Sequence, residues 1–363
     1  MATASSAAPA DAHVFRAAGE STAIDPVQLG AYLESVGLPL DTAEPIRQFG
    51  TGMANINYRL MAGGRRLVLR RPPSGDLPPG AHDMAREFRI LSRLWRVLPL
   101  APEGVHLCED RAVIGVPFQL IEYRPGLVIK GDDVSHFVGK PEVAQHTSRM
   151  LVETLAAVHR VDVAAAGLEA LGKPEGFVQR GIKGWRGRAE RLEFAPNVKL
   201  LASEIGEWLG RQSVRDRPAV LLHSDFKLDN LIVAPDTLAP VAIVDWDMGT
   251  RGDPLFDLAT MLSYWAEPGD PACMADMKQM PSAAPGFATR NEIVAQYATL
   301  TGTDVSDFPV FRVLAMFKLV VVLFQLHALW ARGVAKGADY ASMDRIALEL
   351  LAFTRDVAHG RAH

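Results

Sequence analysis

The stretch His223–Asn230 (HSDFKLDN), followed by Asp245–Asp247 (DWD), decides the fold of this chain. It places an aspartate and an asparagine five residues apart, and a further aspartate fifteen residues later at the end of an apolar segment. In this pattern Asp225 suits a base that orients an attacking hydroxyl and accepts its proton. Asn230 and Asp245 offer the oxygen atoms that a hard cation such as Mg²⁺ prefers. The spacing therefore predicts metal-assisted phosphoryl transfer from ATP.

Two short apolar segments support the placement of these polar residues. Leu231–Val233 and Val241–Val244 read as strands joined by a turn at Pro235–Thr237. Asn230 then precedes one strand, and Asp245 follows its hairpin partner. We expect the hairpin to bring the two side chains to one edge, where a metal ion would bridge them. A surface hairpin with incidental acids would not explain three roles at matching spacing.

Three segments together resemble a known family. HSDFKLDN, then Ile243–Asp247 (IVDWD) and Gly252–Ala259 (GDPLFDLA), are similar to the aminoglycoside phosphotransferase-like, or choline kinase-like, family of small-molecule kinases. The likeness is closest to the branch fused to acyl-CoA dehydrogenases and runs from about Asp25 to the C-terminus. The family usually has glycine after the loop histidine, where this chain has Ser224. The resemblance implies ATP and Mg²⁺ as cofactors.

The pattern of hydrophobic residues predicts an α+β, bilobal, protein-kinase-like fold. Strand-like alternation prevails up to Glu122, and helical periodicity prevails after Pro141. We expect a flexible tail at 1–22, then an N-lobe with an antiparallel sheet plus a helix at 23–123. A mostly helical C-lobe at 124–363 follows, with the catalytic loop, the metal site and the acceptor site.

The composition gives no indication of nucleic-acid or membrane binding. The net charge is −4 and the pI is near 6.2, so nothing global indicates nucleic acid or a membrane surface. Two cysteines, Cys108 and Cys273, fit a reduced, cytoplasmic protein without a disulfide framework. The most hydrophobic segment, Val313–Trp330, contains Lys318, which favours a buried helix over a membrane span. Nothing in the sequence indicates a particular protein partner.

The segment Phe49–Leu60 is predicted to cover the phosphates of the nucleotide. Gly50 and Gly52 lie in a tight turn between apolar residues, which suits a hairpin whose backbone N–H groups bind phosphate. A protein kinase would have a third glycine where this chain has Asn55. The family resemblance favours asparagine at that position.

The next predicted strand, Arg66–Arg70, ends in a cation. Arg70 lies where such kinases place a basic residue to bind the α- and β-phosphates, and Arg71 is the competing candidate. Arginine is always charged and can bind phosphate through two N–H groups. An amphipathic helix, Asp83–Leu98, should follow, and the resemblance implies that its Glu87 pairs with Arg70.

The strand-rich part of the chain ends at a breaker cluster. Ala112–Glu122 reads as a strand, and Arg124 begins a short Arg-Pro-Gly run that we expect to be the hinge. Backbone groups of Glu122 and Tyr123 are then predicted to lie near adenine.

A basic segment at Phe177–Phe194 is the candidate for acceptor binding. In a chain of negative net charge it is unusual, and it indicates a local anion site. A solvated helical face explains it equally well. If it is functional, it disfavours a polycationic aminoglycoside and favours a phosphate- or carboxylate-bearing alcohol, and the resemblance implies a hydroxyacyl-CoA. The candidate residues are Arg180, Lys183, Arg186 and Arg188.

Three alternatives remain beside a small-molecule kinase with an anionic acceptor. A protein kinase is disfavoured, because Gly252–Pro254 starts a helix directly after the metal-binding motif and leaves no room for an activation loop. In a nucleotide-binding pseudokinase, Ser224 and Arg70 would be replacements that followed the loss of catalytic activity. An aminoglycoside-modifying kinase would use the same phosphoryl-transfer residues. In all of these, Asp257 is expected to brace the backbone of the catalytic loop.

Overall fold

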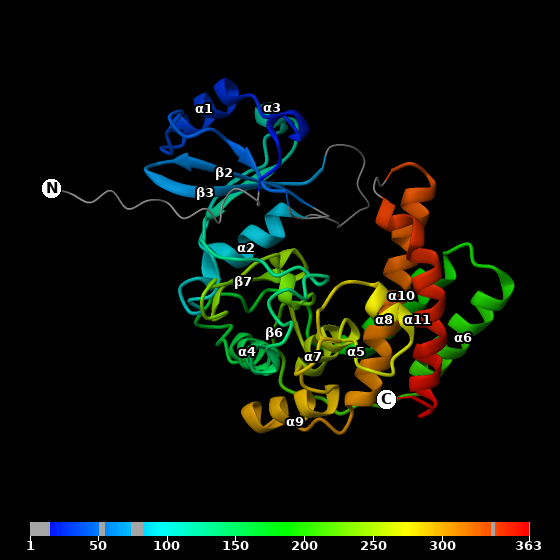
Figure 1. Ribbon diagram of the computed structural model, residues 1–363. Helices are drawn as coiled ribbons and strands as arrows, with labels where there is room; N and C mark the ends of the chain where they lie inside the picture. The colour runs from blue at the N-terminus through cyan, green and yellow to red at the C-terminus, as the bar shows by residue number, and fades with distance from the viewer. Residues whose placement is uncertain (1–14, 51–54, 74–82, 335–337, 363) are drawn as a thin grey trace. The chain divides into compact units, whose positions relative to one another are not determined.

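In the computed structural model, which describes residues 15–50, 55–73, 83–334 and 338–362, the chain divides into two units (Figure 1). The first unit contains Met1–Pro125 and Val244–Asp247, and the second contains Gly126–Ile243 and Met248–His363. An antiparallel sheet forms the centre of the first unit, and the second unit is mostly helical. The predicted α+β, protein-kinase-like fold is therefore confirmed.

The sheet of the first unit has the strand order β1-β2-β3-β5-β4, and all neighbouring strands are antiparallel. The strands are β1 (Arg47–Gln48), β2 (Ile56–Ala62), β3 (Arg65–Arg71), β4 (Gly104–Cys108) and β5 (Phe118–Glu122). The turn between β2 and β3 contains Gly63 and Gly64, with φ of 58° and 70°. Glycine suits this two-residue turn because both positions need positive φ. The pairing of β3 with β5 places Arg70, near the end of β3, opposite Gln119.

Two helices of the first unit begin directly after an aspartate, and for the second of them this is the start that the sequence predicts. Helix α1 (Pro26–Ser35) follows Asp25, and α2 (Met84–Leu94) follows Asp83. Each aspartate accepts hydrogen bonds from backbone N–H groups of the first helical turn, which would otherwise have no partner. Helix α1 packs Leu29 and Leu33 into the core formed with the sheet. Helix α2 is shorter than predicted, because it ends at Leu94 instead of Leu98.

The predicted strand Ala112–Glu122 is wrong in its first half. Residues Arg111–Ile114 form a short helix, α3, and only β5 continues as a strand. The side chain of Asp110 accepts a hydrogen bond from the N–H of Ala112 and thereby starts the helix. Gly115, with φ of 84°, ends it. Local capping by these two residues therefore overrides the strand-like pattern.

Part of the predicted N-terminal tail contacts the first unit. The ring of Phe15 lies 4.9 Å from that of Phe49, centroid to centroid. The N–H of Thr22 donates to the side chain of Gln48 at 2.7 Å. Residues 1–14 of the predicted tail lie outside the described part of the chain.

The second unit consists of helices around two small antiparallel sheets. Its helices are α4 (Pro141–His159), α5 (Phe177–Glu190), α6 (Pro196–Gly210), α7 (Pro254–Ser263), α8 (Ala272–Asp276), α9 (Arg290–Thr301), α10 (Phe308–Ala331) and α11 (Met343–Ala358). One sheet pairs β6 (Val220–Leu222) with β9 (Thr250–Gly252), and the other pairs β7 (Leu231–Val233) with β8 (Pro240–Ile243). The 3-10 turns of this unit lie at Leu228–Asn230 and Ala338–Ser342. A further 3-10 turn, Ala18–Glu20, lies in the first unit, and another, Trp246–Met248, crosses the boundary between the units along the chain. The hairpin that the sequence predicts between Leu231 and Val244 is thus present as β7 and β8.

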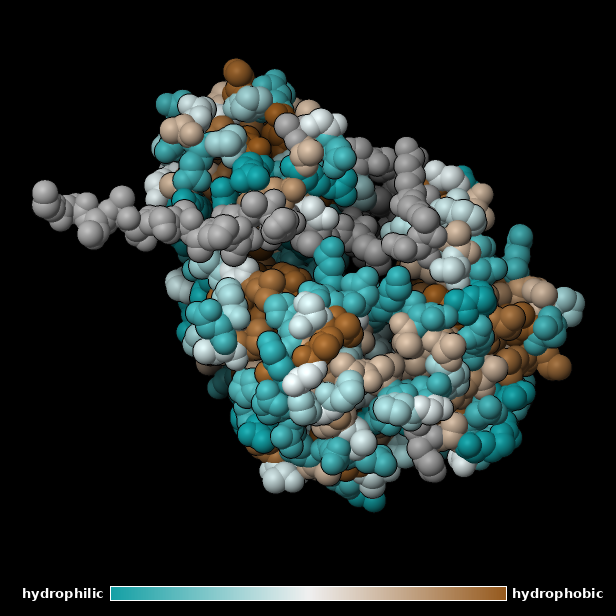
Figure 2. Space-filling view, viewed as in Figure 1, coloured by the Kyte–Doolittle hydropathy of each residue, from teal (hydrophilic) through white to brown (hydrophobic). Residues whose placement is uncertain are grey.

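The burial of helix α10 decreases along its length. Its first half is buried, whereas its last turns are partly exposed at residues such as Trp330. Among the described residues it is the one helix long and apolar enough to cross a membrane, but 56% of its most apolar window is buried inside the protein. Leu200 on α6 and Leu348 on α11 are also exposed, and Figure 2 shows hydrophobic surface on the side where these helices lie. The burial of α10 fits the core helix that the sequence predicts.

Candidate active site

The predicted catalytic loop, in the second unit, begins beside a residue in a strained backbone conformation. Strand β6 ends at Leu222, His223 is fully buried, and Ser224 has a φ of 70°. Only glycine adopts this left-handed region without penalty, and other residues pay about 1–2 kcal/mol. This explains the glycine that the family usually has here. The hydroxyl oxygen of Ser224 is buried and has no hydrogen-bond partner among the described residues.

Asp257, near the start of α7, holds this loop. One carboxylate oxygen accepts the N–H of His223 at 2.6 Å, and the other accepts the N–H of Ser224 at 2.8 Å. The predicted brace is therefore confirmed. Behind it, the buried ring of His159 lies 3.4 Å from the Asp257 carboxylate and 2.6 Å from the hydroxyl of Tyr297.

Lys318 holds the same loop from the other side. Its ammonium group donates to the carbonyl oxygen of Ser224 at 2.8 Å and lies 5.1 Å from the ring centroid of Phe256. Burial lowers the pKa of Lys318, while the nearby Asp225 and Asp257 act against that shift. The sequence predicts only that Lys318 disfavours a membrane span. A lysine within an apolar helix requires a buried acceptor, and that pattern is the signal that could have indicated its contact with the loop.

The side chain of Asp225, the predicted base, is held by two donors. The hydroxyl of Tyr264 donates to Oδ1 at 2.8 Å, and Nδ2 of Asn230 donates to Oδ2 at 3.1 Å. The ammonium of Lys227 lies 3.8 Å from Oδ2. With its side chain 29% exposed, the carboxylate is both oriented and accessible, as a base must be.

In the first unit, Arg70 lies in a buried cluster of charged groups. Its Nε donates to Glu87 at 2.6 Å, and its Nη2 donates to Asp245. Nε2 of Gln119 and the N–H of Trp246 also donate to the Glu87 carboxylate. The predicted pairing of Arg70 with Glu87 is present, and Asp245, the predicted metal ligand, joins it.

The charge state of this cluster follows from its contacts. Burial alone lowers the pKa of Arg70, but Asp245 and Glu87 outweigh burial, so its pKa is raised and it stays charged. Burial also raises the pKa of Glu87. Three donors nevertheless converge on its two oxygens, and only the ionised form accepts all of them without a competing proton, so we take Glu87 as a carboxylate.

The contacts of Arg71, the competing cation, differ from those of Arg70. Arg71 is buried, and its Nε donates to the carbonyl of Pro72 at 3.1 Å. Arg70 bonds to Asp245, a predicted metal ligand. The geometry therefore favours Arg70 as the cation that works beside Asp245.

The predicted nucleotide-binding residues lie in several parts of the first unit. Gly50 is exposed and Asn55 is buried, whereas Gly52 lies outside the described residues. Glu122 is half-buried and accepts the N–H of Glu103 at 3.2 Å. The ring of Tyr123 stacks on that of Phe49, with 6.4 Å between centroids.

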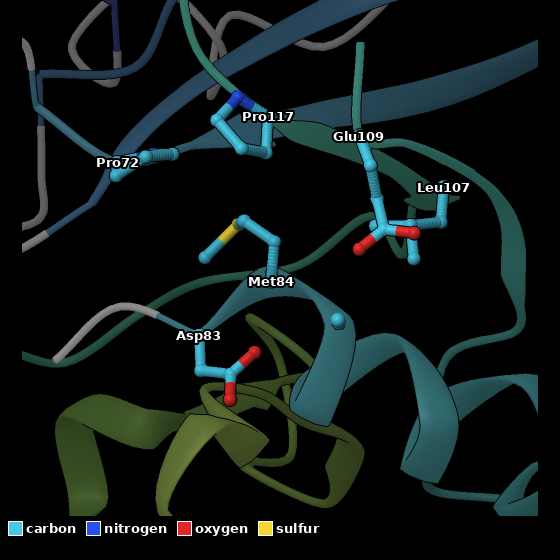
Figure 3. Close-up of a pocket in the computed structure, with 7 residues that line it drawn as sticks. Pro72, Asp83, Met84, Leu107, Glu109 and Pro117 are labelled. Atoms are coloured by element: carbon cyan, nitrogen blue, oxygen red, sulfur yellow. The ribbon is translucent and has the colours of Figure 1, made fainter. Parts of the chain in front are cut away.

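A separate cavity of about 200 Å³ lies at the start of α2 (Figure 3). Its lining residues are Pro72, Asp83, Met84, Ala85, Leu107, Glu109 and Pro117. None of the predicted site residues lines it. The carboxylates of Asp83 and Glu109 would repel phosphate, so this cavity does not suit the phosphates of a nucleotide.

The four basic residues predicted to bind the acceptor lie on α5, but they are not all exposed. Arg180, Lys183 and Arg188 are exposed, and no ion pair involves them within the part of the chain that the structure describes. Arg186 instead packs its side chain over Gly206 and Gly210 of α6. Three of the four candidates therefore form an exposed basic face.

The predicted metal ligands offer oxygen atoms suited to Mg²⁺. Nδ2 of Asn230 donates to the backbone oxygen and to Oδ2 of Asp225, which leaves the amide oxygen of Asn230 for another partner. Asp245 supplies a carboxylate with its side chain 30% exposed. No group of three or more His, Cys, Asp or Glu side chains able to hold a metal occurs among the described residues. Few protein ligands suit Mg²⁺, which usually binds through one or two carboxylates together with substrate phosphates.

A sheet-based unit with a buried Arg–Glu pair, and a helical unit with an oriented Asp in a His-x-Asp loop, define a protein-kinase-like phosphotransferase. Residues 45–292, more than half of the chain, match the phosphotransferase enzyme family (APH). The chain therefore belongs to this family.

Among known proteins, this chain is similar in sequence to acyl-CoA dehydrogenase family members. It is 30% identical over 295 residues to mouse acyl-CoA dehydrogenase family member 10, covering 80% of this chain and 27% of that protein. It is 26% identical over 318 residues to human acyl-CoA dehydrogenase family member 11, covering 86% of this chain and 40% of that protein. The chain thus spans well under half the length of these relatives.

Solved structures share the fold. A protein from Ralstonia eutropha, assigned as an aminoglycoside phosphotransferase, superposes with a TM-score of 0.75 at 23% identity, covering 93% of this chain and 99% of the other. A thermostable mutant of aminoglycoside phosphotransferase APH(4)-Ia, in a ternary complex with AMP-PNP and hygromycin B, superposes with a TM-score of 0.55 at 15% identity, covering 90% of this chain and 99% of the other.

Replacing Ser224 by glycine is expected to stabilise the protein. The change removes the left-handed penalty and a buried hydroxyl without a partner, and the greater freedom of glycine in the unfolded chain offsets part of the gain. We expect about 1 kcal/mol, or a rise in Tm of about 2 °C, by thermal denaturation. The matched control is Ser263→Gly, at a buried helical serine whose hydroxyl donates to Thr260. The control should lower Tm, and a fall in Tm for Ser224→Gly would contradict the strain argument.

Replacing Arg70 by lysine is expected to destabilise the first unit and to weaken ATP binding. A single ammonium cannot reproduce donation through Nε to Glu87 and through Nη2 to Asp245. We expect a loss of about 2 kcal/mol in urea denaturation and a weaker thermal shift with ATP and Mg²⁺. Arg71→Lys is the comparison. If it weakens ATP binding as much as Arg70→Lys does, the choice of Arg70 over Arg71 is wrong.

Proposed function

We propose that this chain transfers the γ-phosphoryl group of ATP to a hydroxyl of a small, anionic molecule such as a hydroxyacyl-CoA. The observation that supports it most is the Asp225 carboxylate, which two donors orient while it remains partly exposed. Membership of the phosphotransferase family supplies the reaction class.

In this proposal Asp225 orients the acceptor hydroxyl and takes its proton. The hydroxyl oxygen bonds to the γ-phosphorus, the bond from that phosphorus to the bridging oxygen of ADP breaks, and ADP leaves. Arg70 neutralises charge on the phosphate oxygens. Asn230 and Asp245 would hold Mg²⁺, which when bound withdraws charge from the phosphates.

The nucleotide-binding roles are also proposals. Gly50, Gly52 and Asn55 would cover the phosphates, and Glu122 and Tyr123 would contact the base. The fold neighbours with AMP-PNP, ADP or GDP bound support nucleotide use in general. ATP as the donor rests on the kinase-like pattern of the catalytic loop.

The exposed basic face of α5 supports an anionic acceptor. Arg180, Lys183 and Arg188 would attract phosphate or carboxylate groups, and coenzyme A carries phosphates. The relatives named as acyl-CoA dehydrogenase family members point to the same class of acceptor. A kanamycin complex belongs to a fold neighbour, and a polycation of that kind would be repelled by this face.

The proposal includes neither a nucleic acid nor a membrane partner, because the net charge is −4 and no global basic surface is expected. The free cysteines Cys108 and Cys273 are both buried and unpaired. They are consistent with work in the reducing cytoplasm.

Asp225→Ala and Asp245→Ala are expected to affect different quantities, kcat and the binding of Mg²⁺ and ATP respectively. Asp225→Ala should lower kcat by roughly a thousandfold and keep ATP binding, because the base does not hold the nucleotide. Asp245→Ala should weaken binding of Mg²⁺ and ATP by at least about tenfold, because a metal ligand is lost. Calorimetric titration with ATP and Mg²⁺, together with steady-state kinetics, measures both effects. The control is Asp236→Ala, at an exposed turn residue between β7 and β8. Equal losses of ATP affinity in the two active-site variants would contradict the assigned roles.

Charge reversal on α5 is expected to raise the KM of the acceptor and to spare ATP. In a variant with Arg180, Lys183 and Arg188 all changed to Glu, an anionic acceptor should have a KM about tenfold higher at low salt. Physiological salt, with a screening length of about 8 Å, should mimic part of this effect in the unchanged protein.

The matched control for charge reversal is Arg211→Glu, at an exposed cation just after α6. The assay compares phosphate transfer to a hydroxyacyl-CoA, to the free hydroxy acid and to kanamycin. Efficient transfer to kanamycin, insensitive to the α5 charges, would overturn the anionic-acceptor proposal and favour an aminoglycoside kinase. ATP binding without transfer to any hydroxyl or to water would favour the pseudokinase.

A further inference from the structure

A tyrosine outside the predicted site residues contacts the proposed base. The hydroxyl of Tyr264 donates to Oδ1 of Asp225 at 2.8 Å, and the ring is 9% exposed. Burial, followed by the charge of Asp225, raises the pKa of Tyr264 well above its ordinary value. Tyr264 therefore keeps its proton and acts as a neutral hydrogen-bond donor.

Helix α7 explains why Tyr264 reaches Asp225. Tyr264 is the residue that ends this helix, and Asp257, which holds the backbone of the catalytic loop, lies seven residues before it. Seven residues turn a helix by nearly two full turns, so the two side chains point to the same face, within about 20°, roughly 10 Å apart. All of α7 is buried. The catalytic loop is thus attached to one rigid helix at two places, its backbone at Asp257 and its reactive carboxylate at Tyr264.

Other groups around Asp225 do not duplicate this contact. Asn230 donates to the opposite carboxylate oxygen, and the ammonium of Lys227 is 3.8 Å away and 5.2 Å from the ring centroid of Tyr264. Lys318 of α10 interacts with the charge of Asp225 and donates to the backbone of Ser224. The charge of Asp229, in the loop, acts on Tyr264. Of the contacts described here, the one from Tyr264 alone fixes Oδ1.

We propose that Tyr264 is a positioning residue for phosphoryl transfer, holding Oδ1 of Asp225 so that Oδ2 meets the acceptor hydroxyl. This inference rests on the proposed role of Asp225 as the base. A carboxylate offers about four acceptor sites, and Tyr264 and Asn230 occupy one site on each oxygen. Their two hydrogen bonds fix the rotation of the carboxylate plane. Without Tyr264 the plane turns more freely, and the hydroxyl is aligned for attack less often.

The test is a double-mutant cycle on the full chain with Tyr264→Phe and Asp225→Asn. Because the acceptor is not identified, water serves as the acceptor, and ADP release at saturating ATP and Mg²⁺ gives kcat. Tyr264→Phe should lower kcat about tenfold or more, as expected for a hydrogen bond to a charged group. The KM for ATP should change less than about twofold, since Tyr264 touches no proposed nucleotide ligand. In the Asp225→Asn background, Tyr264→Phe should lower kcat no further.

The control is Tyr32→Phe, which removes a tyrosine hydroxyl bonded to His106 at 2.9 Å, far from the catalytic loop in sequence. All kinetics are measured well below the lowest Tm of the set, so that loss of folded protein does not enter kcat. Tyr264→Phe with unchanged kcat, or with an equal loss in both backgrounds, would overturn the positioning role. Asp225→Asn with full activity would instead remove the proposed base itself, whatever Tyr264 does, so the two failures are distinguishable.

Discussion

The shape of the predicted catalytic loop depends on the hydrogen bonds that the buried carboxylate of Asp257 accepts. Its two oxygens accept the N–H groups of His223 and Ser224, and Lys318 donates to the carbonyl of Ser224. Both polar backbone groups of a residue in a left-handed conformation are therefore held by buried charges. Charged hydrogen bonds of this kind are strong enough to offset the backbone penalty of a non-glycine residue. This is why the loop keeps its shape although serine stands where the family usually has glycine.

The same arrangement occurs in the first unit. Glu87 is fully buried, and it accepts the N–H of Trp246, directly after Asp245, whose φ is 67°. In the second unit, Asp257 thus fixes the backbone N–H of Ser224, the left-handed residue directly before Asp225. In the first unit, Glu87 fixes the N–H of Trp246, directly after the left-handed Asp245. The strain is local and the support is buried, so the reactive side chains themselves remain partly exposed. A carboxylate can perform this role because it accepts several donors at once, whereas an amide oxygen in its place would carry no charge to strengthen them.

Much of this was predictable from the sequence, and the failures have physical causes. The local pattern of hydrophobic residues predicted the fold and the β7–β8 hairpin. The pairing of Arg70 with Glu87 was implied by the family resemblance. The strand predicted from Ala112 failed because an Asp–Gly pair of caps made a short helix there. Lys318 and Tyr264 were missed because each contacts a loop residue distant in sequence, Ser224 and Asp225 respectively. A seven-residue offset from Asp257 would have placed Tyr264 on the same helix face, but only if the extent of α7 were already known.

The residues proposed for the reaction and those proposed for acceptor binding differ in whether their charged partners are buried. The groups proposed for phosphoryl transfer are supported by buried partners with fixed geometry, which tolerate little change. The cations of α5 proposed for the acceptor are exposed, and Arg186, which turns inward, has become part of the packing against α6. Exposed charges can be gained or lost with little effect on stability. A fold of this kind can therefore keep one reaction while its acceptor changes.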